Sequence, residues 1–202
     1  MFTGIIQAVG KIAQSQARGP DVRLSIAAGG LDLADVQLGD SIAVNGVCLT
    51  VINKHATNFD VDVSAETLRC TIGFGEGEAV NLEKSLRLAD RLGGHLVSGH
   101  VDGVGSVQHF EPLGDCYVLQ VLAPNGLARF IAAKGSITIN GVSLTVNQVQ
   151  GYGFEVNLIP HTLDMTTLKS LQPGSRVNLE VDLLARYAER LMHYTQAPPP
   201  AE

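Results

Sequence analysis

The sequence predicts a mainly β protein made of two similar small domains followed by a C-terminal helix. Three observations support this fold class. Most of the 202-residue chain repeats once at a constant spacing. Glycine is frequent, at 22 residues, and Val, Ile and Thr are spread throughout, which is typical of many short strands joined by turns. Helix-like periodicity is confined to short stretches until residues 182–194.

The repeat organises the chain into two units. "SIAVNGVCLTV" at 41–51 returns as "SITINGVSLTV" at 136–146, an offset of 95 residues. The other matching pairs are "TGIIQAVG" at 3–10 with "SGHVDGVG" at 98–105, "FDVDVSAETL" at 59–68 with "FEVNLIPHTL" at 154–163, and, after a shift of two residues, "VNLE" at 80–83 with "VNLE" at 177–180. A solenoid needs at least about three units to bury a continuous core, so two separate domains are predicted.

Each unit has the same predicted order of elements. A strand and a variable region come first, then a second strand and a short apolar-periodic segment, at 31–39 and at 125–135, where Asn125 is a candidate cap. An Asn-Gly hairpin, an "FxV" strand and the "VNLE" strand follow. About six strands in fewer than ~100 residues suit a small closed barrel, which has no exposed sheet edge. A two-sheet sandwich also fits this pattern and stays open.

The Asn-Gly hairpin has a predictable geometry. Asn45-Gly46 is typical of a type I′ turn, because both turn residues need positive φ. A two-residue loop pairs Ser41 with Thr50 and places Cys48 on the same face. The opposite face carries only large aliphatic side chains, so each hairpin is expected to have one core face and one face of small polar groups. Alone, such a polar face is usually a solvated sheet surface, but its duplication favours ligand binding.

Composition and charge exclude several classes of function. The net charge is −6 and no Lys/Arg cluster occurs, which argues against a nucleic-acid partner. Three widely spaced cysteines without a CxxC motif support neither a disulfide framework nor a zinc ribbon. His95 and His100 are five residues apart, which suits no metal site, although a Gly-flanked histidine at a domain junction is well placed for acid–base work. Cys48 alone is more typically a small buried hydrophobe than a nucleophile.

The sequence also predicts where the protein is located and where its parts begin and end. No apolar run reaches the roughly 18 residues of a membrane span, and the N-terminus does not resemble a signal peptide, so a cytoplasmic protein is expected. The predicted divisions are 1–93 and 94–181 for the two barrels, 182–194 for the helix and 195–202 for a disordered tail. The apolar stripe of the helix has two open interpretations, which are packing against its own barrel and self-association with other subunits.

Several motifs together resemble one known family. "MFTGI", the "NGVCLTV" and "NGVSLTV" pair, "GGHLVSGHVDG", and "LIPHTL" followed by "TTL" are similar to the riboflavin synthase family of the alpha-chain type, with its tandem lumazine-binding barrels. The resemblance covers residues 1–192 and is specific in combination. It implies two six-stranded Greek-key barrels and a C-terminal helix at the contact of a homotrimer.

The resemblance also implies a reaction. Two molecules of 6,7-dimethyl-8-ribityllumazine dismutate by transfer of a four-carbon unit, giving riboflavin and 5-amino-6-(D-ribitylamino)uracil in the last step of riboflavin biosynthesis. No cofactor or metal is implied, and association with lumazine synthase is a further partnership of the family. Two related pockets, one from each of two neighbouring subunits, hold the two substrates, and such positioning is worth up to ~7–11 kcal/mol.

Site residues follow from the motif matches to the family. The predicted N-terminal pocket uses Gly4, Ile5, Ile6, Cys48, Leu49, Thr50, Asp62, Val63, Ser64, Ala65, Glu66 and Thr67. The predicted C-terminal pocket uses Gly99, His100, Val101, Lys134, Ser143, Leu144, Thr145, Ile159, Pro160, His161, Thr162, Leu163 and Asp164.

The catalytic roles implied by the resemblance are hypotheses. His100, with Thr145 and water, manages the proton of the acidic C7 methyl group. Cys48 and Ser41 lie near the other ring as polar or transient nucleophilic groups, and Ser143 is the counterpart of Cys48 on the C-terminal side. Asp182 is a polar neighbour.

Two alternative functions stay open. One is an antenna-type protein that holds lumazine or flavin without turnover. The other, more distant, is a flavin-binding reductase barrel, which leaves the duplication unexplained.

Overall fold

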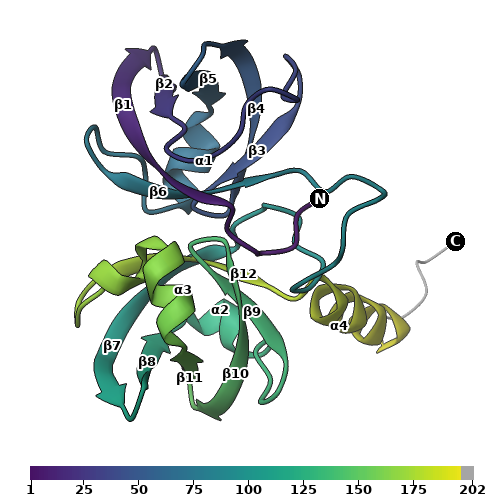
Figure 1. The fold of residues 1–202 in the computed structure, drawn as a ribbon. Helices are drawn as coiled ribbons and strands as arrows, with labels where there is room; N and C mark the ends of the chain where they lie inside the picture. Colours follow the sequence, from purple (N-terminus) through teal and green to yellow (C-terminus); the bar gives the residue numbers. More distant parts are fainter. Residues whose placement is uncertain (197–202) are drawn as a thin grey trace, which may run out of the picture.

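A computed structural model describes residues 1–196 and shows two barrels stacked on one another, with a helix beside the second (Figure 1). The first barrel consists of β1 (Ala8–Arg18), β2 (Asp21–Ala27), β3 (Ser41–Val44), β4 (Val47–Lys54), β5 (Asn58–Val63) and β6 (Ala79–Lys84), with α1 (Ala65–Cys70) after β5. The second consists of β7 (Gly103–Leu113), β8 (Cys116–Leu122), β9 (Ser136–Ile139), β10 (Val142–Gln150), β11 (Gly153–Leu158) and β12 (Arg176–Val181). The remaining elements are α2 (Asn125–Ala128), α3 (Pro160–Met165), the 3₁₀ turn η1 (Thr167–Ser170) and α4 (Leu183–Gln196).

Both barrels close with the same topology. The first has the order β1-β2-β5-β4-β3-β6, and the second has the equivalent order β7-β8-β11-β10-β9-β12. Every pairing is antiparallel, and β1 with β6 and β7 with β12 complete the two rings. The predicted fold class is therefore confirmed, and the closed rings exclude the sandwich alternative. The boundary expected between residues 93 and 94 stays a prediction.

The Asn-Gly hairpins form as predicted. Asn45 and Gly46 have φ values of 47° and 80°, and Asn140 and Gly141 have 48° and 82°, which are the positive values of a type I′ turn. The register pairs Ser41 with Thr50, as expected, and the same pattern recurs between β9 and β10. The short apolar-periodic segments before the hairpins take different forms in the two units. Residues 31–39 form turns, whereas 125–128 form α2, whose N-cap position is occupied by Pro124, without a side-chain cap, and not by the candidate Asn125.

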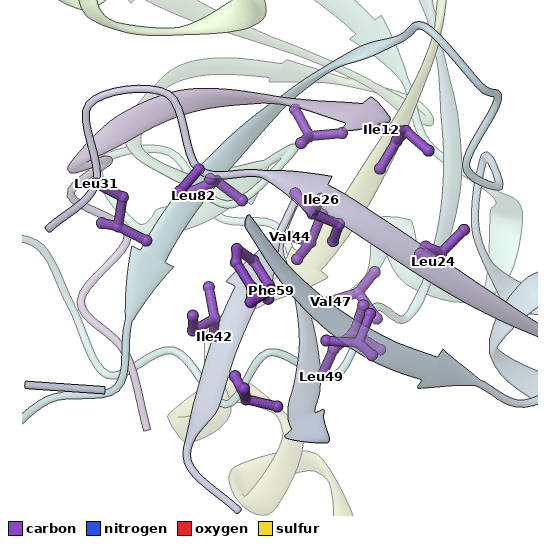
Figure 2. Packing of buried hydrophobic residues seen from close by; sticks show 14 of the residues in the cluster. Ile12, Leu24, Ile26, Leu31, Ile42, Val44, Val47, Leu49, Phe59 and Leu82 are labelled. Atoms are coloured by element: carbon purple, nitrogen blue, oxygen red, sulfur yellow. The ribbon is translucent and has the colours of Figure 1, made fainter. Parts of the chain in front are cut away.

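Each barrel encloses its own hydrophobic core. In the first barrel the inward side chains of successive strands meet around the axis, with Ile42, Val44 and Phe59 fully buried (Figure 2). The second core is built from the equivalent positions of β7–β12. Leu68 of α1 and Leu163 of α3 pack on the first and second core, respectively, so each short helix is held against its own barrel. Two separate cores fit the two-domain prediction made from the repeat.

The two barrels meet at their hairpin turns. A Cβ atom on Gly46 would lie 2.8 Å from the Gly141 nitrogen, and one on Gly141 would lie 2.7 Å from the Gly46 nitrogen. No side chain fits in this contact, so glycine is required at both positions by close approach as well as by its φ value. The turns therefore pack directly against each other at a junction with approximate two-fold symmetry.

Four buried asparagines extend this contact. The Asn81 Nδ2 atom donates to the Asn140 carbonyl at 2.9 Å, and the Asn178 Nδ2 atom donates to the Asn45 carbonyl at 3.0 Å. The Oδ1 atoms of Asn45 and Asn140 accept from the backbone N–H groups of Asn81 and Asn178 within the same barrels. The junction is therefore a reciprocal polar network with every partner buried.

The C-terminal helix begins at Leu183 and ends at Gln196, so it differs by one or two residues from the predicted range. The predicted tail thus begins within this helix, and its remainder, 197–202, lies outside the described residues. Across residues 1–196, no helix has the length and apolar character that crossing a membrane requires.

Candidate functional site on the polar hairpin faces

The outward face of the first barrel carries a row of polar side chains. Ser41 pairs with Thr50 across β3 and β4, and Val51 pairs with Val61 across β4 and β5. The next outward positions on β4 and β5 are therefore Thr50 and Asp62, which are both exposed. Three strands thus present predicted site residues on one surface.

Arg23 extends this row and was not predicted. It pairs with Asp62 across β2 and β5, and its guanidinium contacts the Asp62 carboxylate at 2.7 and 2.8 Å. The hydrogen bond from Arg23 holds the pKa of Asp62 below its ordinary value. Asp62 is therefore a charged hydrogen-bond acceptor in a fixed orientation, and no local motif signalled its partner on a strand 39 residues away.

The second barrel repeats the row with different chemistry. Ser136 pairs with Thr145, and β11 places Asn157 outward where β5 places Asp62. Asn157 pairs with Val118, which stands where the first barrel has Arg23. The amide replaces the ion pair, so the two polar faces are related but not identical. The repeat spacing of 95 residues could have identified Asn157 in the sequence as the counterpart of Asp62.

The two short helices begin beside these rows. Ser64 caps α1, because its Oγ atom accepts from the Thr67 N–H at 3.2 Å. The equivalent helix α3 begins with Pro160 after Ile159 and has no side-chain cap. Glu66 forms an ion pair with Arg69 at 2.5 Å, and His161 and Asp164 are exposed. The predicted segments 62–67 and 159–164 therefore occupy matched places at the ends of β5 and β11.

A buried glutamate holds each loop that precedes a barrel. The Oε1 atom of Glu83 accepts from the Thr3 N–H at 2.7 Å and the Thr3 hydroxyl at 2.6 Å, and Oε2 accepts from the Gly4 N–H at 2.9 Å. Glu180 accepts the same three bonds from Ser98 and Gly99. The "VNLE" repeat thus ends in a carboxylate that fixes the backbone of the "TG" and "SG" motifs.

These loops exchange partners between the barrels, which brings together residues that were predicted for different pockets. The Gly4 carbonyl accepts from the Ser143 N–H on the second barrel, and the Gly99 carbonyl accepts from the Cys48 N–H on the first, both at 2.8 Å. Ile6 packs on the second core and Val101 on the first. Gly4 and Ile6 therefore belong with Ser143, and Gly99 and Val101 with Cys48.

The surroundings of Cys48 and Ser143 differ sharply. Cys48 packs against the apolar cluster of Phe2, Ala43 and Val97. The Ser143 Oγ atom lies 2.7 Å from Nδ1 of His95, a residue left out of the predicted site. The signals for His95 in the sequence were its place after Gly94 and within the "GGHLVSGHVDG" motif.

Several predicted binding residues cannot present their side chains to a ligand. Leu49 and Val63 line the first core, and Leu144 lines the second, because they occupy inward positions of their strands (Figure 2 shows Leu49). Leu163 is partly buried against the second core. Any contact that Leu49, Val63 or Leu144 makes with a ligand is therefore made by the backbone.

His100 and Thr145, predicted to act together, lie on different barrels. His100 is exposed between Gly99, which is bound to Cys48, and Val101, which packs on the first core. Thr145 is exposed on β10 of the second barrel. A site in which the first barrel of one chain meets the second barrel of another, as the resemblance implies, would bring these residues together.

A cavity of about 660 Å³ lies beside β3 and β6. Ser41 and Ile5 line it together with charged groups that include Lys84 and Arg87. Ser41 thus belongs both to the outward row and to this cavity, whose lining does not include Cys48 or Thr50. Among the residues described, no group of three or more His, Cys, Asp or Glu side chains is arranged to hold a metal ion.

The two buried glutamates carry a prediction about pH. Burial raises the pKa of Glu83 and Glu180 above the ordinary 4.5, although hydrogen bonds from Thr3 and Ser98 oppose the shift. The native state then binds more protons than the unfolded chain, so this stabilisation is complete below pH 4.5 and is lost as pH rises through the raised pKa values.

Glu83→Gln is therefore expected to flatten the fall in the free energy of unfolding between pH 4.5 and neutral pH. Urea denaturation at several pH values measures this slope. Glu76→Gln, at an exposed loop position, is the control and is expected to keep the wild-type slope. An unchanged slope in Glu83→Gln would contradict the assignment.

Comparisons with known proteins agree with this fold. The family model of the lumazine binding domain matches residues 3–85 and 98–182. Riboflavin synthase of Photobacterium phosphoreum is 46% identical over 194 residues, which cover 95% of this chain and 89% of that protein. Riboflavin synthase of Mycobacterium tuberculosis strain H37Rv is 47% identical over 198 residues, which cover 95% of this chain and 98% of that protein.

Solved structures give the same relationship. The crystal structure of LumP complexed with 6,7-dimethyl-8-(1'-D-ribityl) lumazine aligns with a TM-score of 0.80 at 27% identity, covering 90% of this chain and 99% of that one. LumP complexed with riboflavin aligns with a TM-score of 0.81 at 29% identity, with the same coverage. Two lumazine binding domains, the matching fold and close relatives over nearly the full length lead to one conclusion: the chain belongs to the riboflavin synthase family of enzymes.

Proposed function

We propose that this chain is a transferase that converts two molecules of 6,7-dimethyl-8-ribityllumazine into riboflavin and 5-amino-6-(D-ribitylamino)uracil, the last step of riboflavin biosynthesis. A four-carbon unit passes from one lumazine to the other. The atoms of the two substrates balance those of the two products, so the exchange needs no external oxidant or reductant. The cytoplasm as its location and an association with lumazine synthase are parts of the same proposal.

One observation carries the proposal most strongly. Both barrels keep a polar hairpin face beside a carboxylate-held loop, and the faces differ at Cys48 against Ser143 and at Asp62 against Asn157. Two related but unlike pockets can hold identical substrates in opposite roles, as donor and acceptor. Holding both reactants in one orientation replaces a bimolecular encounter by an effectively unimolecular step.

The test is direct. Purified protein mixed with 6,7-dimethyl-8-ribityllumazine is expected to form riboflavin, seen by its absorbance, with two lumazines consumed for each riboflavin. The alternative function is an antenna-type protein, which the likeness to LumP favours. A stable complex with unchanged lumazine would support that alternative and would overturn the enzyme proposal.

The proposed active site lies between subunits of a homotrimer, with α4 in the contact. Arg186 donates to Asp102, and Arg129 forms an ion pair with Glu189 at 2.8 Å, so the polar side of α4 is tied to its own barrel. Leu184 and Tyr187, by contrast, are 72% and 61% exposed. The apolar stripe is thus not packed on its own barrel at these residues, and exposed apolar surface of this kind supports self-association.

Lys134 provides a prediction about substrate binding. It is exposed and has a φ of +68°, in the place where the first unit has Gly39 with a φ of +92°. A left-handed conformation costs a non-glycine residue about 1–2 kcal/mol, and such strain is concentrated at functional sites. Lys134→Gly is expected to keep or raise the free energy of unfolding by up to about 1 kcal/mol, while weakening lumazine binding roughly tenfold through loss of the cation.

Fluorescence titration with lumazine and urea denaturation measure these two quantities. Lys134→Asn is the matched variant, because asparagine tolerates positive φ without a charge. It is expected to show the same loss of affinity. Lower stability combined with unchanged affinity would show that the strained lysine serves the fold alone.

A further inference from the structure

His95 lies in the segment between β6 and β7, where two hydrogen bonds of its own tie it to the second pocket. Its backbone N–H donates to the Thr3 carbonyl at 3.2 Å, and its Nδ1 atom lies 2.7 Å from the Ser143 Oγ atom. The Ser143 N–H donates to the Gly4 carbonyl next to Thr3. Glu83 in turn fixes both Thr3 and Gly4. The imidazole and the hydroxyl are therefore held by one rigid framework.

The surroundings of Nε2, the second ring nitrogen of His95, indicate whether Nδ1 donates a hydrogen bond to the Ser143 Oγ atom or accepts one from it. Nε2 is buried and, within residues 1–196, has no hydrogen-bond partner; no other buried side-chain nitrogen or oxygen there lacks one. A buried N–H without an acceptor is rarer than an acceptor without a donor, so we assign the ring proton to Nδ1. Burial lowers the pKa of His95 below 6.5, although Asp182 opposes the shift, so the ring is neutral at neutral pH.

We propose that His95 is a positioning residue that donates its Nδ1 proton to the Ser143 Oγ atom, so that Ser143 presents its own hydroxyl hydrogen to the bound substrate. The inference rests on the proposed function, because it assigns a role within the same site. Ser143 then acts as an oriented hydrogen-bond donor instead of a nucleophile, since a histidine that donates to Oγ cannot accept the hydroxyl proton.

The first pocket has no such pair. Cys48, the counterpart of Ser143, packs against Phe2, Ala43 and Val97, and its backbone N–H binds Gly99. A thiol is a weak donor, and no imidazole orients it. The two lumazines therefore meet different groups at equivalent positions, an oriented hydroxyl in one pocket and an apolar-packed thiol in the other. This asymmetry suits substrates that must react in unlike roles.

Three substitutions of His95 test which ring atom makes the hydrogen bond to Ser143. An asparagine amide can donate near the place of Nδ1, a glutamine amide reaches toward Nε2 instead, and phenylalanine keeps the ring without nitrogen. His95→Gln and His95→Phe are expected to lower kcat roughly 10- to 100-fold with KM unchanged, because a misplaced group impairs the reaction more than binding. His95→Asn is expected to keep kcat within about threefold of the wild type. Equal losses in all three variants would overturn the proposal.

A double-variant cycle separates positioning from a purely structural role. In the Ser143→Ala background, His95→Phe is expected to lower kcat no further, because the hydroxyl that it orients is gone. The same fold loss in both backgrounds would contradict the proposal. Thermal unfolding shows whether each variant is folded.

A spectroscopic measurement on the unaltered protein keeps the proposal testable if the variants do not fold. Nitrogen-15 NMR is expected to show His95 as the neutral Nδ1–H tautomer, and an Nε2–H tautomer would overturn the proposal. This result does not depend on turnover. Failure of the wild type to form riboflavin would instead remove the proposed function, so the two failures can be told apart.

Discussion

Asn81→Ala is expected to lower the free energy of unfolding by roughly 2–6 kcal/mol, because it leaves two polar groups at the barrel junction without partners. The Asn81 Nδ2 atom donates to the Asn140 carbonyl at 2.9 Å, and its Oδ1 atom accepts from the Thr167 N–H at 2.8 Å. Asn81 is 1% exposed. Water therefore cannot replace either bond without opening the junction.

The repeat supplies a matched variant. The Asn178 Nδ2 atom donates to the Asn45 carbonyl, and its Oδ1 atom accepts from the Ile72 N–H at 2.8 Å, so Asn178→Ala is expected to cause a similar loss. Asn125→Ala, at the exposed start of α2, is the control and is expected to change stability by less than about 0.5 kcal/mol. Urea denaturation measures all three. A junction variant no less stable than the control would show that the network does not hold the barrels together.

Much of the fold could be predicted because its signals are local. The Asn-Gly pair fixed the hairpin turn, and strand alternation then assigned Ile42 and Val44 to the core and Thr50 to the surface. The repeat transferred these assignments to the second unit. Such patterns depend on neighbouring residues, so they are visible in one sequence.

The docking of the two barrels could not be predicted in the same way. Its contacts join positions such as Gly4 with Ser143, which no periodicity relates. The simplest expectation placed each loop with its own barrel, and the structure shows that the loops cross instead. His95 lies just outside the repeated "SGHVDGVG" segment, so the alignment of the two units offered no counterpart that would have drawn attention to it.

This crossing of the loops has a consequence for the active site. The Phe2–Val97 bridge joins the two loops. The loop that contains Phe2 binds Ser143 through Gly4, and the loop that contains Val97 binds Cys48 through Gly99. Paired backbone thus lies between Cys48 and Ser143 within one chain, beside the point where the two hairpin turns touch. A second barrel that completes either pocket is therefore expected to come from another subunit, as the proposed trimer requires.

Two inactive variants mixed together are expected to recover about a quarter of the wild-type activity, because in the proposed cyclic trimer each site takes a first barrel from one subunit and a second barrel from its neighbour. Thr50→Trp and Thr145→Trp are suited to this test. Both residues are exposed at equivalent outward positions, so the indole blocks one polar face and leaves the core intact. Each variant alone is expected to form almost no riboflavin.

Refolding the two variants together at equal amounts gives random trimers, and one site in about four then combines two intact barrels. Sedimentation establishes that mixed trimers form, and a mixture of the separately refolded variants, without exchange of subunits, is the control. Because a site within one chain would always contain one blocked face, the same mixed trimers would then stay inactive. Activity that returns only in mixed trimers would place each active site between the first barrel of one subunit and the second barrel of the next.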